Sequence, residues 1–259
     1  MSKTALITGA SNGIGYELAR IHAEKGGDLV LVARSKDKLD VLKKELEKKH
    51  KVRVITIGKD LSLTGSASEV YDELEQNSIS VDYLINNAGL GDFGFFAGSD
   101  WKKQETMINL NITALTHFTR LYLPEMIRRG NGKILNLAST ASFQPGPTMA
   151  VYFATKAYVL SFSEAISNEV RDKGISVTAL CPGSTESGFQ AAAIEGKMPL
   201  KARKKPSSRQ VAEYGYKAMI RGKTVAIHGL KNKIIATSIR FIPRFLVTTA
   251  ARKIQEKKH

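Results

Sequence analysis

The stretch from Thr4 to Gly15 constrains the fold of this chain more than any other; it reads Thr-Ala-Leu-Ile-Thr-Gly-Ala-Ser-Asn-Gly-Ile-Gly. Residues 5–8 have the composition of a buried strand, the glycines predict a tight turn, and residues 14–23 predict an amphipathic helix. A helix N-terminus presents unpaired N–H groups and a positive dipole end, so this turn is a candidate phosphate or diphosphate site. The candidate residues are Gly9, Ser11, Asn12, Gly13, Ile14 and Gly15.

The glycine spacing needs support from elsewhere in the chain. It is Gly-x-x-x-Gly-x-Gly, which differs from the common Gly-x-Gly-x-x-Gly dinucleotide motif. Taken alone, the stretch also fits a glycine-rich turn between a strand and a helix that binds nothing.

Strands and helices alternate along most of the sequence. The segments that predict strands are 5–8, 28–33, 52–57, 82–86, 133–138 and 175–180, and those that predict helices are 14–23, 35–49, 66–76, 101–129 and 150–172. Because the strands are apolar throughout, we expect a parallel sheet covered on both faces. The predicted fold class is α/β, a doubly wound Rossmann-type sheet of about seven strands with helices on both faces. Ser66 and Glu69 have capping-box spacing and are expected to begin the third helix.

The composition limits which classes of protein this chain can belong to. The chain has 259 residues, 42% of them hydrophobic and 24% charged, which is enough for one large globular domain. Cys181 is the only cysteine, so an internal disulfide is impossible and a reducing compartment is expected. We expect no secretory signal, and the sequence has no apolar run of spanning length and no metal-ligand spacing among the five histidines. A cytoplasmic protein without a bound metal is expected.

Arg34 directly follows the second predicted strand, where dinucleotide-binding folds meet the adenosine ribose. An acid at this place binds the 2′-hydroxyl of NAD, whereas an arginine accommodates the 2′-phosphate of NADP. The guanidinium suits a phosphate because its planar fork donates two charge-assisted hydrogen bonds. The alternative is a surface arginine at the end of a strand.

Tyr152 and Lys156 lie four residues apart in a predicted helix, so the phenol and the ammonium share one face. An ammonium beside a phenol favours the phenolate, and we expect Lys156 to lower the pKa of Tyr152 and make it usable for proton transfer. Ser139 ends the preceding strand, where its hydroxyl could bind a substrate oxygen beside the phenol. Asn111 lies inside a long predicted helix, a costly place for an amide unless its polar groups are used.

Taken together, these motifs resemble the short-chain dehydrogenase/reductase family over about residues 4–190. The matching positions, in family order and spacing, are Thr8, Gly9, Gly13, Gly15, Asp60, Asn86, Asn87, Ala88, Gly89, Asn111, Ser139, Tyr152, Lys156, Pro182 and Gly183. The resemblance implies that Tyr152 donates a proton to a carbonyl and that Ser139 orients this carbonyl. It also implies that Lys156 lowers the tyrosine pKa and binds the nicotinamide ribose, and that Asn111 holds a water in a proton relay.

The resemblance further implies an NADP(H) cofactor. Asp60 would bind the adenine, Asn87 would fix the cofactor and the central sheet, and the backbone after Pro182 would hold the carboxamide. The implied cofactor contacts are Gly9, Ser11, Asn12, Gly13, Ile14, Gly15, Arg34, Asp60, Leu61, Asn87, Ala88, Gly89, Tyr152, Lys156, Pro182, Gly183, Thr185 and Ser187.

The chain departs from the family at four places. Asn12 stands where NADP-preferring relatives often carry a basic residue, which leaves most of the preference to Arg34. Thr185 and Ser187 replace the usual aliphatic residue and threonine, and Ser187 keeps a hydroxyl for the cofactor. Ala114 replaces a common glycine, which is expected to change only helix packing.

Positive charge divides the chain into a body, a loop and a tail. The net charge is +15; six basic residues and no acid lie between Lys197 and Arg209, and eight basic residues against Glu256 alone lie between Lys231 and His259. We expect an oxidoreductase domain at 1–230, with a mobile substrate lid at 184–209, and a basic amphipathic tail at 231–259. Apolar lid residues, with three phenylalanines after the fourth strand, predict a hydrophobic pocket; they are Phe93, Phe95, Phe96, Phe189, Ile194, Met198 and Leu200. The basic loop fits either a solvated surface or an acidic substrate group.

The tail has apolar residues at helical spacing, interrupted at Pro243. Three interpretations stay open: packing over the substrate mouth or a second subunit, contact with an anionic membrane, and binding of an acidic partner, with nucleic acid unlikely. Long-chain oxoacyl and sterol reductases of the family have comparable tails.

The expected function is therefore NADP-dependent reduction of a ketone or aldehyde, or oxidation of the alcohol, on a hydrophobic small molecule (class 1.1.1) by a homodimer or homotetramer. The alternative is a catalytically weak NADP-binding scaffold or sensor that acts through its tail.

Overall fold

A seven-stranded parallel sheet organises the molecule. The computed structural model describes residues 2–186 and 205–256. The strands are β1 (Thr4–Thr8), β2 (Asp28–Ala33), β3 (Val54–Gly58), β4 (Tyr83–Asn86), β5 (Gly132–Leu137), β6 (Ile175–Cys181) and β7 (Val225–Ile227). Their order in space is β3-β2-β1-β4-β5-β6-β7, and all neighbouring pairs are parallel. The order reverses between β1 and β4, the point at which doubly wound sheets bind ligands. The predicted fold class is confirmed.

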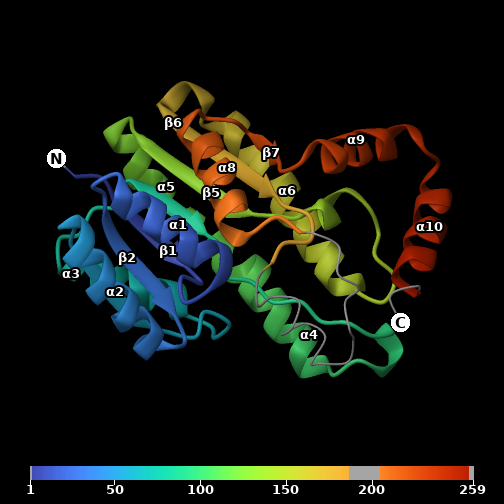
Figure 1. The fold of residues 1–259 in the computed structure, drawn as a ribbon, viewed down its shortest axis with the longest axis horizontal. Coiled ribbons are helices and arrows are strands. Elements are labelled where there is room, and N and C mark those ends of the chain that lie inside the picture. The colour runs from blue at the N-terminus through green and yellow to red at the C-terminus, as the bar shows by residue number, and fades with distance from the viewer. Residues whose placement is uncertain (1, 187–204, 257–259) are drawn as a thin grey trace.

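Helices cover both faces of this sheet (Figure 1). They are α1 (Gly13–Glu24), α2 (Lys36–His50), α3 (Ser66–Gln76), α4 (Trp101–Ile108), α5 (Leu115–Arg129), α6 (Ala150–Glu169), α8 (Ser208–Ile220), α9 (Leu230–Ser238) and α10 (Arg244–Glu256). Shorter helical turns are η1 (Phe96–Gly98), η3 (Thr140–Phe143), η4 (Arg171–Lys173), η5 (Ile239–Phe241) and the π-helix η2 (Asn109–Ala114). One face carries α1, α2 and α8, and the other carries α3, α5 and α6.

The apolar strands explain this double coverage. In β1, Ala5 and Ile7 point into the cluster with α1, α2 and α8, whereas Leu6 points into the cluster with α3 and α5. All three are fully buried. Because successive strand residues face opposite sides, an apolar run requires a core on each side of the sheet.

One predicted helix feature differs in the structure. The capping box is wrong: Gly65 is the N-cap of α3, Ser66 is the first helical residue, and the Glu69 carboxylate pairs with Lys59. The predicted helical stretch 101–129 is confirmed, and α4, η2 and α5 follow one another within it. The π-helical segment η2 contains Asn111, whose amide bonds outside the helix.

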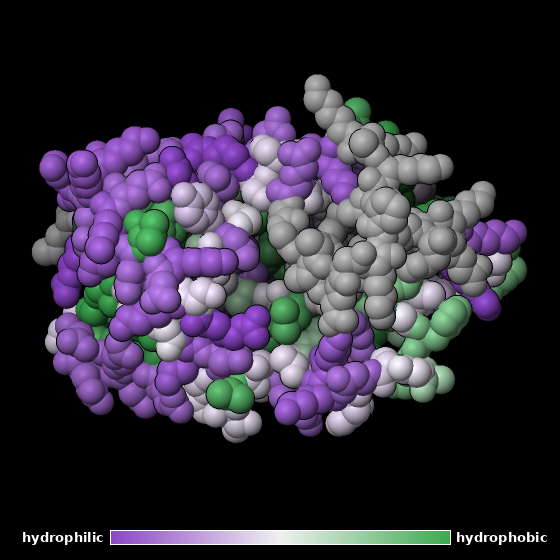
Figure 2. Space-filling view, turned by 60° about the horizontal axis from the view of Figure 1, so that its bottom comes forward, coloured by the Kyte–Doolittle hydropathy of each residue, from purple (hydrophilic) through white to green (hydrophobic). Residues whose placement is uncertain are grey.

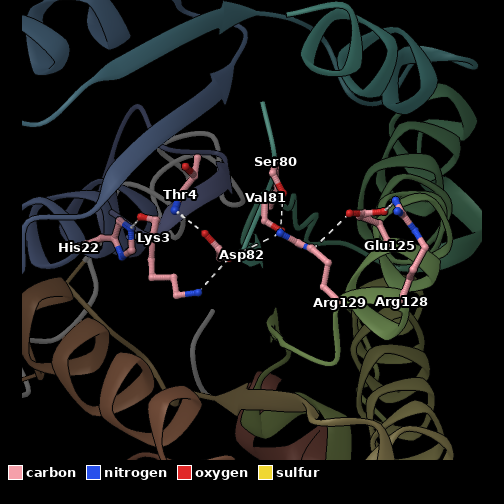
Figure 3. A network of polar contacts seen from close by, with 9 residues as sticks. All are labelled: Lys3, Thr4, His22, Ser80, Val81, Asp82, Glu125, Arg128 and Arg129. Atoms are coloured by element: carbon pink, nitrogen blue, oxygen red, sulfur yellow. Dashed lines mark hydrogen bonds and ion pairs between the residues drawn. The ribbon is translucent and has the colours of Figure 1, made fainter. Parts of the chain in front are cut away.

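Ion pairs close the amino edge of the sheet, where the strands begin (Figure 3). Asp82, which precedes β4, accepts a hydrogen bond from the backbone N–H of Thr4 at 3.0 Å and pairs with Lys3 at 3.3 Å and Arg129 at 3.6 Å. The Arg129 guanidinium also donates to the Val81 carbonyl at 2.6 Å. These contacts tie β1, β4 and the end of α5 together.

The chain after β7 leaves the sheet at its carboxyl edge. In Figure 1, α9 and α10 lie at the end of the molecule opposite the N-terminus.

Arg209, counted with the basic loop, belongs to α8 and pairs with Glu24 at 2.6 Å and Glu213 at 2.7 Å. Within residues 2–186 and 205–256, none of the helices combines the length and apolar character needed to cross a membrane.

Candidate active site

The glycine turn between β1 and α1 is shaped by close backbone contacts. Gly9 and Gly13 have left-handed backbone, with φ of 68° and 58°, which favours glycine. A Cβ on Gly15 would lie 2.3 Å from the Asn87 amide nitrogen and 2.5 Å from the Gly9 carbonyl oxygen, so a side chain there would force the turn apart. Asn12 is the N-cap of α1, and its side chain makes no capping hydrogen bond. The first N–H groups of α1 are therefore left to a ligand, as a diphosphate requires.

Asn87 locks this turn to the end of β4. Its side-chain amide donates to the carbonyls of Thr8 at 2.9 Å and Gly9 at 3.1 Å. In return, the Thr8 hydroxyl oxygen accepts the backbone N–H groups of Asn87 and Ala88, both at 3.0 Å. The two strands at the switch point are thus held at a fixed separation.

Asn111 lies in the π-helix, buried between the loop after β4 and α6. Its amide pairs with both backbone groups of Leu90, accepting from N–H at 2.8 Å and donating to C=O at 2.9 Å. It also donates to the Thr155 hydroxyl at 3.0 Å. The amide therefore fixes the Gly89–Leu90 backbone against the helix that carries Tyr152 and Lys156.

Tyr152 and Ser139 meet at the carboxyl edge. Ser139 follows β5, and its Oγ accepts the Ala141 N–H at 3.1 Å as the N-cap of η3. Burial raises the pKa of Tyr152 to about 12, and its hydrogen bond with Ser139 acts in the opposite direction. The net shift of this pKa is therefore upward, opposite to the lowering that was expected from Lys156. The phenol is consequently in its protonated form near neutral pH.

Lys156 lies on the same face of α6, with Nζ 6.0 Å from the centre of the Tyr152 ring. The side chain is buried, and Nζ donates to the Leu137 carbonyl at 2.7 Å. Burial lowers the pKa of Lys156 to about 8, partly offset by its interaction with Cys181. A Cβ on Gly89 would lie 3.4 Å from Nζ, so this glycine keeps open the approach to the ammonium.

Arg34 and Asp60 lie beside each other after β2 and β3. Burial would raise the pKa of Asp60, but hydrogen bonds from the Ser62 side chain and backbone, with the Arg34 charge, hold it below its usual value. The Ser62 bonds are 2.7 and 3.0 Å long. Leu61 is buried, whereas the Arg34 side chain is exposed. The ionised Asp60 carboxylate and the exposed Arg34 guanidinium therefore lie near each other at the carboxyl ends of β3 and β2.

Pro182 and Gly183 form the turn after β6. The Pro182 carbonyl accepts the Thr140 N–H at 2.9 Å, which joins this turn to the segment after Ser139. The Thr185 hydroxyl donates to the Gly183 carbonyl at 3.0 Å. Ser187 lies outside the described residues, as do the predicted pocket residues Phe189, Ile194, Met198 and Leu200. Phe95 and Phe96 are exposed, and Phe93 is partly buried.

The structure brings Gly89, Asn111, Ser139, Tyr152 and Lys156 to one place and the glycine turn next to it. Sequence reasoning missed residues that position this group. Thr155, Ser142 and Asn232 are the main ones. The Ser142 hydroxyl, for example, donates to the Lys156 carbonyl at 2.7 Å. Small polar residues beside the motifs were the signal available, but such residues are common on any surface.

Known proteins resemble this chain over most of its length. Residues 3–197 match the short chain dehydrogenase family. The chain is 36% identical over 188 residues to very-long-chain 3-oxoacyl-CoA reductase-A of Danio rerio, covering 70% of this chain and 58% of that protein. It thus spans less than two thirds of the length of this curated relative.

Two solved structures are similar over nearly their whole length. A short-chain dehydrogenase from Sphingobium yanoikuyae in complex with NADPH has 32% identity and a TM-score of 0.83, over 92% of this chain and 93% of that one. The bulky-bulky ketone specific alcohol dehydrogenase from Comamonas testosteroni has 32% identity and a TM-score of 0.79, over 92% of both chains.

Proposed function

Because this chain belongs to the short-chain dehydrogenase/reductase family, we propose that it is an NADP(H)-dependent oxidoreductase that reduces a ketone or aldehyde, or oxidises the alcohol, on a hydrophobic substrate. The observation that carries the proposal is the convergence of Ser139, Tyr152 and Lys156 beside Gly89, at the edge where the glycine turn opens. A hydroxyl, a phenol and an ammonium at this place are what proton transfer to a carbonyl oxygen requires.

Each group has a distinct task in this proposal. The Tyr152 phenol, protonated near neutral pH, donates its proton to the carbonyl oxygen. The Ser139 hydroxyl donates a hydrogen bond to the same oxygen and orients it. The Lys156 ammonium stabilises the phenolate that forms and binds the ribose next to Gly89. Asn111 keeps the Gly89–Leu90 backbone in place. When bound, the nicotinamide supplies the hydride.

The residues present fit a dinucleotide. The α1 N-terminus has no side-chain cap, and the glycine turn leaves room for close approach of a diphosphate. Asp60 would bind the adenine end. The exposed Arg34 would pair with the 2′-phosphate, which favours NADP(H) over NAD(H).

A hydrophobic substrate is supported by the names of the relatives, one a very-long-chain 3-oxoacyl-CoA reductase and another specific for bulky ketones. The exposed Phe95 and Phe96 on η1 would take part in binding it. We include in the proposal residues 1–230 as the catalytic domain, 184–209 as the substrate lid, and assembly as a homodimer or homotetramer.

The test is turnover with purified protein. NADPH and NADH oxidation would be followed with a panel of aliphatic and aromatic ketones, aldehydes and 3-oxoacyl thioesters of increasing chain length. We expect NADPH-dependent reduction that becomes faster with longer apolar substrates. Tight NADPH binding without turnover on any compound would instead favour the scaffold or sensor, and size-exclusion chromatography checks the assembly.

A further inference from the structure

The C-terminal helices carry large apolar side chains that the body of the protein does not cover. Phe241 is 83% exposed, Phe245 70% and Leu230 76%. Ile234, Ile235, Ile242, Leu246 and Ile254 are also exposed. We call this set, on α9, η5 and α10, the tail surface. Monomeric proteins rarely expose so many neighbouring large apolar residues without a partner.

In the tail helices the buried side chains are small or medium-sized, whereas the large apolar ones are exposed. Among the α10 residues whose burial is described, Val247 and Ala251, one helical turn apart, are buried. Phe245 lies on the opposite side of this helix from Val247, because residues two positions apart in a helix are separated by about 200° around its axis. In α9 Ala236 is the buried residue. The apolar side chains are therefore presented outward and are not a poorly packed core.

The side chains around these apolar residues are mostly basic, which favours an anionic partner. Between Leu230 and Glu256 the sequence has six basic residues and one acid. Among the described residues, no ion pair involves Lys231, Lys233, Arg240, Arg244 or Lys253. A second copy of the tail would bring these like charges together, and lysine is depleted in protein interfaces. Aromatic and aliphatic side chains interleaved with unpaired cations are typical of helices that lie on anionic membranes.

The tail surface begins close to the candidate active site. Helix α9 begins three residues after β7, and Asn232 lies against Gly183, where an added Cβ would be 2.6 Å from the Asn232 amide nitrogen. The tail surface thus borders the carboxyl edge that holds the site. In Figure 2, one end of the molecule is mostly hydrophilic with scattered hydrophobic residues, and hydrophobic residues also lie beside the grey atoms at the other end.

We propose that the tail surface docks the protein on an anionic lipid bilayer, with its apolar side chains in the interface and its basic side chains on the lipid headgroups. Docking holds the carboxyl edge of the sheet next to the membrane. The inference goes beyond the proposed reaction, and binding is measured without substrate. Failure of either proposal is therefore detected independently of the other.

The experiment is sedimentation of the full chain with vesicles of phosphatidylcholine alone or mixed with phosphatidylglycerol. We expect binding to the anionic vesicles only, weakened by added salt. Arg240→Glu/Arg244→Glu should reduce the partition constant about 25-fold or more, from the contribution of two basic residues near an anionic surface. Phe241→Ser/Phe245→Ser should reduce it at least about tenfold. Both pairs are exposed, so the melting temperature should stay unchanged.

Matched controls lie on α2, at the other end of the molecule. Val41 is 69% exposed, and Lys44 and Lys48 are exposed and one turn apart. Val41→Ser and Lys44→Glu/Lys48→Glu should leave vesicle binding within about twofold. Equal binding to neutral vesicles, or equal loss in the α2 variants, would overturn the proposal. If only the arginine variant lost vesicle binding, the surface would be a site for polyanions and the proposal would be wrong. It would also be wrong if the protein bound no vesicles but self-associated, and if the phenylalanine variant abolished this self-association.

Discussion

The two edges of the sheet use polar side chains in opposite ways. At the amino edge, Asp82 is matched by Lys3, Arg129 and the Thr4 N–H, so opposite charges satisfy one another. At the carboxyl edge, burial moves the pKa values of Tyr152 and Lys156 away from the usual ones. The comparison indicates that paired groups stabilise the fold, whereas groups held in an unfavourable environment are available for chemistry.

The largest expected effect is at the carboxyl edge. Tyr152→Phe should lower turnover by about 10² to 10⁴, the usual contribution of a positioned general acid, because it removes one hydroxyl. Binding of NADPH, followed by its fluorescence, should be retained. Substantial residual turnover would remove the phenol from the role that distinguishes this edge.

Burial of Lys156 should appear as a pH dependence of stability. The folded state lowers this pKa from 10.5 to about 8, so between these values the unfolded chain binds more protons and stability rises with pH. The rise should amount to roughly 3 kcal/mol. Chemical denaturation without cofactor should show that this part of the rise is missing in Lys156→Met. Parallel curves for both proteins would contradict the assigned burial.

Two exposed arginines at opposite edges of the sheet should differ in their effect on the preference for NADPH over NADH. Arg34→Ala should weaken NADPH binding by about 1.5–3 kcal/mol, the range for a hydrogen bond to a charged group, with little change for NADH. Arg53, just before β3 at the amino edge, is the matched control, and Arg53→Ala should change neither affinity. Titration calorimetry checks both. An equal loss for the two cofactors would show that Arg34 does not contact the 2′-phosphate.

The smallest effect concerns the amino edge. Asp82→Ala leaves the Thr4 N–H and two cations without their acceptor and should lower the free energy of unfolding by about 1–2 kcal/mol. The turnover number under native conditions should not change, whereas Ser139→Ala, which also removes the cap of η3, should lower turnover by more than its loss of folded protein explains. A loss of turnover in Asp82→Ala that exceeds its loss of folded protein would mean that the edges are not separate.

Much of this arrangement could be predicted from the sequence because its signals are local. The glycine turn is encoded by consecutive residues, and the common face of Tyr152 and Lys156 follows from their four-residue spacing. The capping box failed because the N-cap lies one residue earlier, at Gly65, and the Ser66 N–H that the Glu69 side chain would bind already donates to the Leu63 carbonyl at 3.2 Å. The contact of Asn111 with the Leu90 backbone, 21 residues away in sequence, is one that no helical pattern reveals.

By itself, the sequence determined the order of strands and helices as far as β6, the edge at which the motifs gather and the basic, apolar character of the tail, since periodicity and spacing act within a few residues. Only the tertiary structure decided that the Tyr152 pKa is raised, that Asp82 joins two strands and that Phe241 and Phe245 face outward. Burial and electrostatic environment depend on groups brought together from distant parts of the chain, and they exist only once the sheet has formed.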